Sequence, residues 1–409
     1  MFPTLDYLTW IRGRPAAATH DLGSSDLDPT EPSATPDPVP ERLRGLADPD
    51  HDRPLAAQIA AEYGVDPTQV LPTAGATHAN FLVAAAALSA RGADASTAAH
   101  DTTGPPRETT EPAHDTATAA VPRVLVESPG YEPLVATPDT LGGRVERFER
   151  SDGRLDADRL AAAVEGGVTA GTADPSTSPL ALVTVSNRHN PTGRLASRSE
   201  LADVAAVTAA SDGLCHVDEV YAPYGAAATG DSDETARDDD RTAFGGPTAA
   251  GLPNTVVTGS LTKFHGFGGV RLGWVVGPDR WIERVERVRH YVPGVAEPSV
   301  ALARRFFAHR DELVAAGRDH CRRNAALLAD FVADRSDVTT TAPPGCPFGL
   351  LTHDRADGDT VAEAAWDAGI LVVPGRFFGC PESVRVSLGR APEHCEPALA
   401  ALGDVLDDL

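Results

Sequence analysis

The chain has 409 residues, more than one hydrophobic core usually holds, so we expect two packed domains. Its 59 acidic residues outnumber the 35 basic ones and leave a net charge of −24, which argues against a nucleic-acid-binding protein because that class needs a basic surface. The sequence has no bilayer-length apolar stretch, no secretion-signal pattern at the N-terminus and no CxxC pair among its five cysteines, which predicts a soluble, cytoplasmic protein without a membrane span, a disulfide framework or a zinc knuckle.

The N-terminal part of the chain gives weak signals followed by two clear helices. Residues 1–45 are rich in Pro, Asp and Gly without a sustained period, so we expect an extended arm. A helical pattern covers 55–63 and stops at Gly64, and an apolar helix is predicted over about 78–90. Residues 92–120 are an Ala/Thr/Asp/Pro tract with nothing to bury, which predicts a solvated insertion.

Short β-rich runs bounded by turn residues come next. They are 124–127, 181–186, 214–218, 255–260 and 273–277. Helical patterns at 156–165 and 199–210 lie between some of them. Strands that alternate with helices indicate an α/β protein with a mostly parallel sheet covered by helices on both faces.

The C-terminal third has a different character. Residues 226–250 form a second acidic loop, and beyond Pro278 the pattern turns helical over 281–292 and 298–334. It then becomes mixed and ends in a helix after Pro392. We therefore place a domain boundary near residue 278.

This boundary gives a division into three parts. The predicted parts are an N-terminal arm that joins the small domain (1–45), a large domain that contains the insertion (46–278) and a smaller α+β domain (279–409). In a sheet of this kind, ligands bind beyond the carboxyl ends of the strands. Polar residues follow four of the predicted strands at that edge: Tyr131, Asn190, Asp218 with Tyr221, and Ser260 with Lys263.

Lys263 is the single lysine of the chain, against 34 arginines. Asp (38) also outnumbers Glu (21), a composition that suits concentrated salt because short carboxylates hold water and salt screens their repulsion. We attribute the acidity to salt adaptation rather than to an acidic partner-binding face. Where lysine is so strongly depleted, the remaining one is expected where arginine cannot replace it. A lysine amine can lose its proton and attack a carbonyl.

The segment around this lysine, residues 260–274, reads SLTKFHGFGGVRLGW. Its glycines let the backbone approach a bound group, and Ser260 and Arg271 are donors suited to a phosphate. Neighbouring positive charge is expected to lower the pKa of the Lys263 amine. The segment resembles that of the class I/II aminotransferases, pyridoxal-phosphate enzymes of fold type I, in which Ser-x-x-Lys is followed eight residues later by arginine and then by Gly-Trp.

The resemblance extends over about residues 55 to 390 and implies roles for further residues. Gly75-Ala76-Thr77 looks like the family's phosphate cradle, since N–H groups at a helix start bind an anion well. Tyr131, in ESPGY, is similar to the aromatic residue that stacks on the pyridine ring. Asn190, in NPTG, resembles the residue whose amide points at the cofactor's phenolic oxygen.

Two more motifs complete the set. Asp218 and Tyr221 resemble the family's Asp-x-x-Tyr element, which implies that Asp218 keeps the pyridine nitrogen protonated and that Tyr221 donates to the phenolic oxygen. Arg385, in SVRVSLG, matches the arginine that grips the substrate carboxylate. Taken singly, the motifs also fit ordinary roles, such as a helix start, a packed aromatic, a turn or a helix cap.

Together they predict a pyridoxal-phosphate-dependent aminotransferase that moves an amino group between an amino acid and a 2-oxo acid. The resemblance implies that Lys263 holds pyridoxal 5′-phosphate as an imine and then carries the substrate's α-proton, with Lys263, Asp218 and Tyr221 as the catalytic residues and no metal. It also implies a homodimer. The family's tyrosine that reaches a neighbouring subunit's phosphate is missing from residues 46–53, where His51 is a stand-in.

Other functions remain open at this point. Decarboxylation, elimination and cyclising replacement on the same cofactor begin from the same state, and the sequence does not reveal which bond breaks. A cofactor-binding regulator is a second alternative, although no basic helix-turn-helix segment precedes residue 45. A structural protein with a degenerate site is disfavoured because Lys263, Asp218 and Asn190 are all present.

Overall fold

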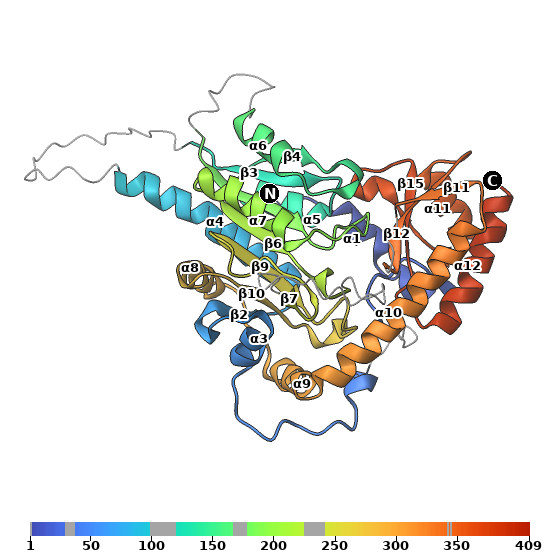
Figure 1. The fold of residues 1–409 in the computed structure, drawn as a ribbon, viewed down its shortest axis with the longest axis horizontal. Coiled ribbons are helices and arrows are strands. Elements are labelled where there is room, and N and C mark those ends of the chain that lie inside the picture. The colour runs from blue at the N-terminus through green and yellow to red at the C-terminus, as the bar shows by residue number, and fades with distance from the viewer. Residues whose placement is uncertain are drawn as a thin grey trace, which may run out of the picture.

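Two β-sheets lie side by side in the computed structural model of the protein, and helices cover both of them (Figure 1). The structure describes residues 2–28, 37–98, 120–166, 178–224, 242–341, 343 and 346–409, with the helical backbone alone for 91–98. Residues 99–119 of the predicted insertion (92–120) and most of the acidic loop at 226–250 lie outside these residues, while 92–98 continue the preceding helix instead of starting an insertion. Within them, no helix combines the length and the apolar character that a membrane span requires.

The larger sheet has seven strands, and the predicted fold class is confirmed. Their order is β2 (Val70–Thr73), β10 (Gly273–Val276), β9 (Thr255–Ser260), β6 (Leu214–Asp218), β5 (Leu180–Ser186), β3 (Arg123–Ser128) and β4 (Arg144–Glu149). β10 runs antiparallel to both of its neighbours, while the pairs from β9 to β4 are parallel. All five strands predicted from the β-rich runs are present.

Helices cover both faces of this sheet because its strands are apolar on both sides. In β3, for example, Val124 and Val126 face one core, while Leu125 faces the other. The first core is closed by α4 (Ala76–Ala98), α5 (Glu132–Thr140) and α8 (Asp279–Arg289), and the second by α3 (Leu55–Tyr63), α6 (Ala157–Glu165) and α7 (Arg198–Ala210).

The smaller sheet is antiparallel and packs against helices from the C-terminal part of the chain. Its strands are β11 (Val338–Thr340), β12 (Phe348–His353), β15 (Ser383–Ser387) and β14 (Val373–Pro374), in that order. The helices are α10 (Arg310–Ala333), α11 (Gly358–Asp367) and α12 (Pro392–Asp407). A separate two-stranded ribbon joins β7 (Thr242–Ala243) to β8 (Gly246–Pro247).

Three details differ from the prediction. The helix expected over 298–334 is two helices, α9 (Glu297–Ala308) and α10, because the backbone leaves helical geometry at His309 (φ −116°, ψ 20°). Strand β4 was missed because it lies at the sheet edge and reads RVERFE, with its charged side chains partly buried or exposed. Strand β2 was missed because it is four residues long and contains Pro72.

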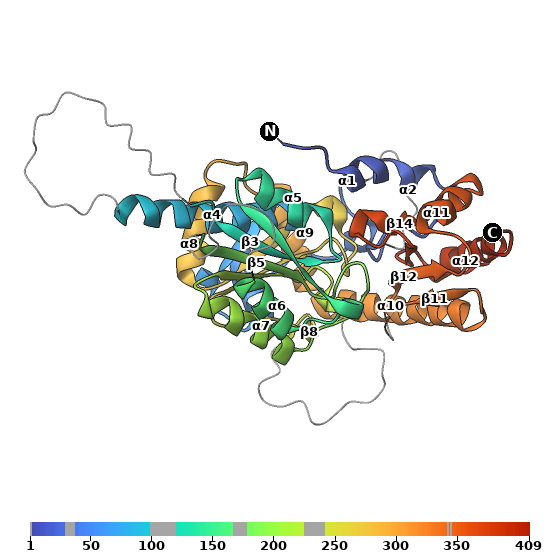
Figure 2. The same ribbon diagram turned by 90° about the horizontal axis from the view of Figure 1, so that it is seen from above.

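The N-terminal segment is not an extended arm, and this prediction is wrong. It forms α1 (Asp6–Ile11), α2 (Arg14–Ala17) and β1 (His20–Asp21), and β1 pairs in parallel with β13 (Ile370–Leu371). Figure 2 shows α1 and α2 lying across the junction between the two sheets, beside α11. Residues 21–28, which we call the strap, then run through the interior, where Leu22 and Leu27 are fully buried. Contacts with distant residues, rather than a local period, order this segment.

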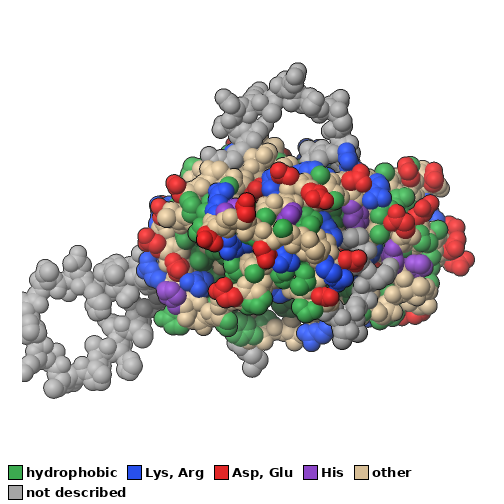
Figure 3. Space-filling model, turned by 90° about the horizontal axis from the view of Figure 1, so that it is seen from below, with side chains coloured by type: hydrophobic (Ala, Val, Ile, Leu, Met, Phe, Trp, Pro, Cys, Tyr) green, Lys and Arg blue, Asp and Glu red, His purple; other side chains and the backbone are tan. Residues whose placement is uncertain are grey.

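Charged side chains are spread widely over the surface. Figure 3 shows acidic groups scattered among arginines over one face, with a cluster at the end of the molecule that carries α12. The formal charge of the whole chain is −24.

Candidate active site

A pocket of about 210 Å³ lies at the carboxyl edge of the seven-stranded sheet. Its lining includes every residue predicted for the site except Gly75: Ala76, Thr77, Tyr131, Asn190, Asp218, Tyr221, Ser260, Lys263, Arg271 and Arg385. Gly75 lies directly behind the lining, since a Cβ on it would be 2.9 Å from Nη2 of Arg271. The structure thus brings together residues that the sequence separates by more than 300 positions.

The strand ends explain why these side chains meet. Asp218 is the last residue of β6 and Ser260 is the last residue of β9. Parallel strands end at the same edge, so both side chains point into the same space. Arg271 reaches this edge because it has φ +52°, a left-handed conformation that returns the chain into β10. Arg385 comes instead from β15 of the smaller sheet, so the pocket is closed from two sides.

One end of the pocket is built from the start of α4. The first N–H groups of a helix have no partner within the helix, and they favour an anion. The glycines around this start allow a close approach: a Cβ on Gly273 would lie 2.7 Å from the amide nitrogen of Ala76. The glycine of the Gly-Trp in the lysine segment, Gly273, is therefore required for β10 to pack against the helix start. Arg271 and Ser260 add donors at the same end.

Asp218 is buried and is held by two hydrogen bonds. The side-chain amide of Asn80 donates to its Oδ2 at 2.8 Å, and the backbone N–H of Val220 donates to its Oδ1 at 3.1 Å. Burial raises the pKa of Asp218 to about 6, while these two hydrogen bonds act in the opposite direction. A cationic ring nitrogen placed against this carboxylate would relieve the cost of burying its charge.

Asn80 is the end of a longer chain of hydrogen bonds. Thr258 Oγ1 donates to Asn80 Oδ1 at 2.7 Å, His216 Nε2 lies 3.1 Å from Thr258 Oγ1, and Thr184 Oγ1 lies 3.4 Å from His216 Nδ1. Burial lowers the pKa of His216 to about 3, so the ring is neutral, with one donor and one acceptor nitrogen. Because Thr258 donates to Asn80, His216 donates to Thr258, and the chain runs in one direction toward Asp218.

Lys263 lines the same pocket. Its amine donates to Oγ of Ser25 at 3.3 Å, and Ser25 Oγ is 2.6 Å from the hydroxyl of Tyr221. Burial lowers the pKa of Lys263, but Tyr221, Asp26 and Tyr7 together outweigh it, so that the pKa is raised. The expected lowering is wrong for the protein alone, because the oxygens around the amine outweigh the opposing effect of Arg385.

Arg385 is fully buried and is held on three sides. Its Nη1 donates to Oδ1 of Asn190 at 3.0 Å, and its Nη2 donates to the carbonyl of Gly23 at 3.1 Å. The hydroxyl of Tyr7 lies 3.4 Å from the same Nη2. Among the described residues, its Nε has no hydrogen-bond partner. A planar donor with an unused N–H at a pocket wall suits an anionic group.

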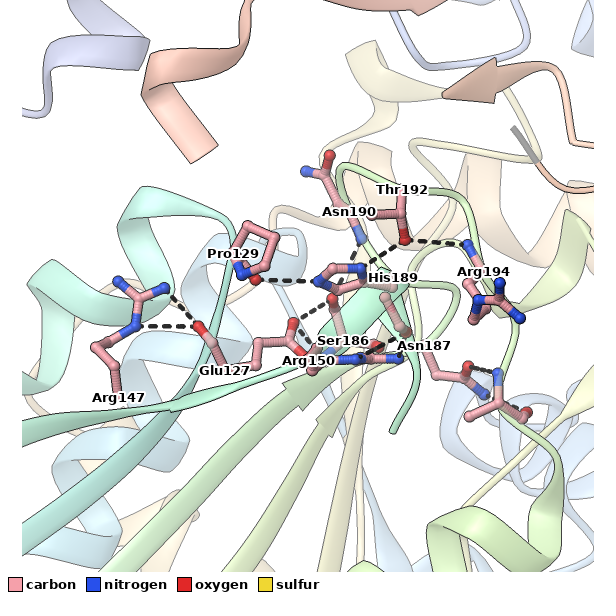
Figure 4. Close-up of polar contacts among 12 residues, drawn as sticks. Glu127, Pro129, Arg147, Arg150, Ser186, Asn187, His189, Asn190, Thr192 and Arg194 are labelled. Carbon is pink, nitrogen blue, oxygen red and sulfur yellow. Dashed lines mark hydrogen bonds and ion pairs between the residues drawn. The ribbon is translucent and has the colours of Figure 1, made fainter. Parts of the chain in front are cut away.

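A buried network supports the loop that carries Asn190 (Figure 4). Glu127 and Arg150 form a fully buried ion pair of 2.6 Å, and Ser186 donates to Glu127 through both its N–H and its hydroxyl. His189 contacts the carbonyl of Pro129 at 3.0 Å, which joins this loop to the segment before Tyr131. In Figure 4 the side chain of Asn190 points away from the sheet, toward the pocket that it lines.

Several residues near the pocket were missed by the sequence analysis. Asn80 had a usable signal, because it lies four positions after Ala76 and therefore on the same face of α4. Tyr7 and Ser25 had none, since both come from the segment expected to be extended. The remaining lining residues that were missed are Leu134, Ser186, Val220 and Thr262. His51, the suggested stand-in for the family tyrosine, is exposed and does not line this pocket.

Comparisons with known proteins agree with the geometry. Residues 113–402 match the sequence profile of the family described as aminotransferase class I and II. Histidinol-phosphate aminotransferase of Halobacterium salinarum is 28% identical over 291 residues, 69% of this chain and 70% of the relative. Capreomycidine synthase of Streptomyces vinaceus is 27% identical over 159 residues, 38% of this chain and 41% of the relative.

The fold is also similar to that of solved structures. A PLP-dependent aminotransferase from Streptococcus suis superposes with a TM-score of 0.72 at 18% identity. The match covers 100% of this chain and 98% of that structure. The whole architecture, including the segment before β2, is therefore of this fold.

Proposed function

The chain belongs to the aminotransferases of class I and II. We propose that the protein moves an amino group between an amino acid and a 2-oxo acid, and that Lys263 carries the substrate's α-proton in this reaction. The protein is a pyridoxal-phosphate-dependent transaminase. The observation that carries the proposal is that one pocket is lined by the chain's single lysine, a buried carboxylate and a buried arginine. The reaction requires an attachment point and proton carrier, a partner for the ring nitrogen and a site for the substrate carboxylate, and these three residues can fill these roles.

The residues present fit pyridoxal phosphate. The N–H groups at Gly75, Ala76 and Thr77, with Ser260 and Arg271, would hold the phosphate, in a cradle that a Cβ on Gly75 would fill. The cofactor, once attached to Lys263, supplies an electron sink for the bonds at the substrate's α-carbon.

The other lining residues would orient the ring. Tyr131 would stack on it, and Asp218 would accept from its nitrogen. Tyr221 and Asn190 would donate to its phenolic oxygen. Asn190 has its oxygen engaged by Arg385, which leaves its NH₂ group for that donation.

Arg385 would fix the substrate by its carboxylate, in a two-pronged contact shared with Asn190. With the carboxylate held there, the α-carbon would lie in the same pocket as the amine of Lys263. The amine would take the α-proton as a base and then, as an acid, deliver it to the carbon that was the cofactor's aldehyde carbon. Arg385 is buried and Lys263 is half-buried, so protein shields much of this transfer from water.

The contacts of Arg385 also suggest which compound donates the amino group. An α-amino acid places its carboxylate on Arg385, whereas histidinol phosphate, named by the relative from Halobacterium, would place its phosphate there. A guanidinium binds either anion well, so both kinds of amino donor should be tested in the same titration.

The test is a visible-absorbance titration of the holoenzyme in concentrated potassium chloride, with amino acids and histidinol phosphate added one at a time. The expected result is a yellow band that bleaches with one donor and recovers when a 2-oxo acid is added. Arg385→Gln, as the control, should keep the band and lose the response to the donor. Bleaching that no 2-oxo acid reverses would favour decarboxylation, elimination or cyclisation instead.

We also propose how the chain assembles, how it divides into domains and where in the cell it is located. A groove of about 680 Å³ between α4 and α8 is lined by apolar side chains such as Phe81, Val288 and Val292, beside Tyr291, which is 90% exposed. A second copy would cover such a surface, which supports a homodimer. We retain the predicted division into an N-terminal segment (1–45), a large domain (46–278) and a small domain (279–409), a cytoplasmic location and adaptation to salt. Sedimentation in concentrated salt would test the dimer.

A further inference from the structure

The strap, residues 21–28, places one hydroxyl between two groups of the site. Ser25 Oγ accepts from the amine of Lys263 at 3.3 Å and lies 2.6 Å from the hydroxyl of Tyr221. Lys263 Nζ is 5.7 Å from the centre of the Tyr221 ring, and Ser25 bridges the two side chains. Ser25 is 6% exposed, so solvent has little access to this bridge.

The position of Ser25 is fixed by contacts that do not involve its own side chain. Tyr224 donates to the carbonyl of Ser25 at 2.7 Å, and the N–H of Leu27 donates to the carbonyl of Lys263 at 2.9 Å. Earlier in the strap, Arg390 forms a 2.8 Å ion pair with Asp21. Removal of the Ser25 hydroxyl should therefore leave the strap in place.

The protons at the bridge can be counted. A serine hydroxyl donates once and accepts up to twice. Since Lys263 donates to Ser25, the serine proton is free to go to Tyr221, and the short 2.6 Å separation indicates that a proton lies between the two oxygens. If Ser25 donates there, the proton of Tyr221 is left to point into the pocket. The three groups then form one chain of donors from Lys263 through Ser25 to Tyr221 and into the pocket.

We propose that Ser25 is a positioning residue of this transaminase, which holds the amine of Lys263 and turns the phenolic proton of Tyr221 into the pocket. The proposal rests on the proposed role of Lys263 as the proton carrier. It assigns to the N-terminal strap a direct influence on the reacting amine, 238 positions away in the sequence. An alanine at this position would leave Tyr221 free to donate elsewhere and the amine without its serine acceptor.

The first test uses the protein without cofactor and relies on its single lysine. Reductive methylation with ¹³C-formaldehyde labels Lys263 and the terminal amine, whose ordinary pKa near 8 separates its NMR titration from that of a lysine. The titratable and charged groups that face Lys263 are Tyr221, Asp26, Tyr7, Arg385 and Asp218, and the variants leave all five unchanged. Ser25→Ala should lower the pKa of Lys263, because it removes an acceptor from the charged amine.

The control is Ser24→Ala in the same strap. The hydroxyl of Ser24 lies 3.4 Å from Nη2 of Arg390 and outside the bridge, so this variant should leave the titration of Lys263 unchanged. Ser25→Thr keeps a hydroxyl and should restore the wild-type titration. Equal unfolding midpoints for the three variants would show that the strap is intact, and Ser25→Thr keeps the test informative if Ser25→Ala folds poorly.

The second test uses the holoenzyme. Ser25→Ala should shift the pH at which the visible band changes and reduce kcat about ten-fold, the equivalent of one hydrogen bond to a charged group, with KM for the amino donor little changed. An unchanged lysine titration together with an unchanged band would overturn the proposal. Failure of the proposed function would give another result. The wild type would then show no visible band, while the lysine titration of the cofactor-free protein would still test the role of Ser25.

Discussion

Asn80 donates a hydrogen bond of 2.8 Å to Oδ2 of Asp218, although the two residues lie 138 positions apart. Asn80 stands on the first turns of α4, whose start would bind the cofactor's phosphate, and Asp218 ends β6, where the ring nitrogen would lie. One helix therefore serves both ends of the cofactor. Thr258 orients the amide from behind through its 2.7 Å hydrogen bond, and His216 orients Thr258.

Asn80→Ala should weaken cofactor binding about ten-fold, because it removes a hydrogen bond to a charged group and frees the Asp218 carboxyl to rotate. It should also raise the pKa of Asp218, since the lost bond favours the charged form. The dissociation constant of pyridoxal phosphate, followed by absorbance, measures the first effect. Thr339→Ala, at an exposed position of β11 away from the pocket, is the control. Equal dissociation constants for the two variants would contradict the role given to Asn80.

The buried charge of Asp218 predicts a pH dependence of the cofactor-free protein. Its pKa is raised from 3.8 to about 6 by burial, so between these values the folded chain binds more protons than the unfolded one. This contribution to stability is present below pH 4 and is lost as the pH rises through 6. Relative to the wild type, Asp218→Asn should therefore gain about 3 kcal/mol in the free energy of unfolding between pH 4 and pH 7.

Urea unfolding of both cofactor-free proteins at a series of pH values measures this difference. Asparagine could fit the site less well, but this would lower the free energy of unfolding of the variant by the same amount at every pH. The change of the difference with pH is therefore still informative. If the difference in the free energy of unfolding does not change between pH 4 and pH 7, burial does not disfavour the charged form of the Asp218 carboxyl. Added pyridoxal phosphate should reduce the pH dependence of the wild type, since a ring cation compensates the carboxylate.

Five strands of the seven-stranded sheet and most of the pocket could be predicted from the sequence because their signals are local. Strands such as β5 and β6 are apolar runs with turn residues on both sides, and the residues that follow them share one edge by topology alone. Gly64 ends α3 in a left-handed conformation, as the pattern predicts. These features need no knowledge of distant contacts.

The remaining parts depend on distant contacts that have no local signal. Tyr7 is ordered by packing against Tyr131 and Phe378, and Glu132 caps α1 by accepting from the N–H groups of Asp6 and Tyr7. Ser25 is placed by bonds to residues some 200 positions away. The direction of the Lys263 pKa was predicted wrongly for the same reason. The boundary near residue 278 and the individual roles of the site residues remain predictions.

The ion pair between Glu127 and Arg150 should be a strong determinant of stability. Both side chains are fully buried, and the pair supports the loop that carries Asn190. Arg150→Met should cost about 3–5 kcal/mol in the free energy of unfolding, because it leaves a buried carboxylate without its partner. Arg159→Met, which breaks an exposed pair with Glu149, should cost about 0–1 kcal/mol. Denaturant unfolding in concentrated salt compares the two, and similar losses would contradict the argument.

Lys263→Arg should abolish both half-reactions. Arginine keeps the positive charge but stays protonated, so it can neither attach the cofactor nor carry the α-proton. Borohydride reduction of the wild-type holoenzyme should fix the cofactor on a single peptide, since the chain holds one lysine. The same treatment should leave the variant unlabelled. Turnover by the variant, or a label elsewhere in the wild type, would refute the assignment.

The charge of the chain predicts dependence on salt. With 59 acidic against 35 basic residues, self-repulsion is unscreened at low ionic strength, where the Debye length grows to about 30 Å at 0.01 M. Exposed pairs such as Arg44 with Asp37 contribute little in return. Dialysis from concentrated potassium chloride to low salt should therefore unfold the protein and dissociate the proposed dimer, as measured by circular dichroism and sedimentation. A neutral osmolyte at equal osmolality should not protect the fold as well as salt does, because it screens no charge. An unchanged spectrum after dialysis would show that the acidic surface serves another purpose, such as binding a partner.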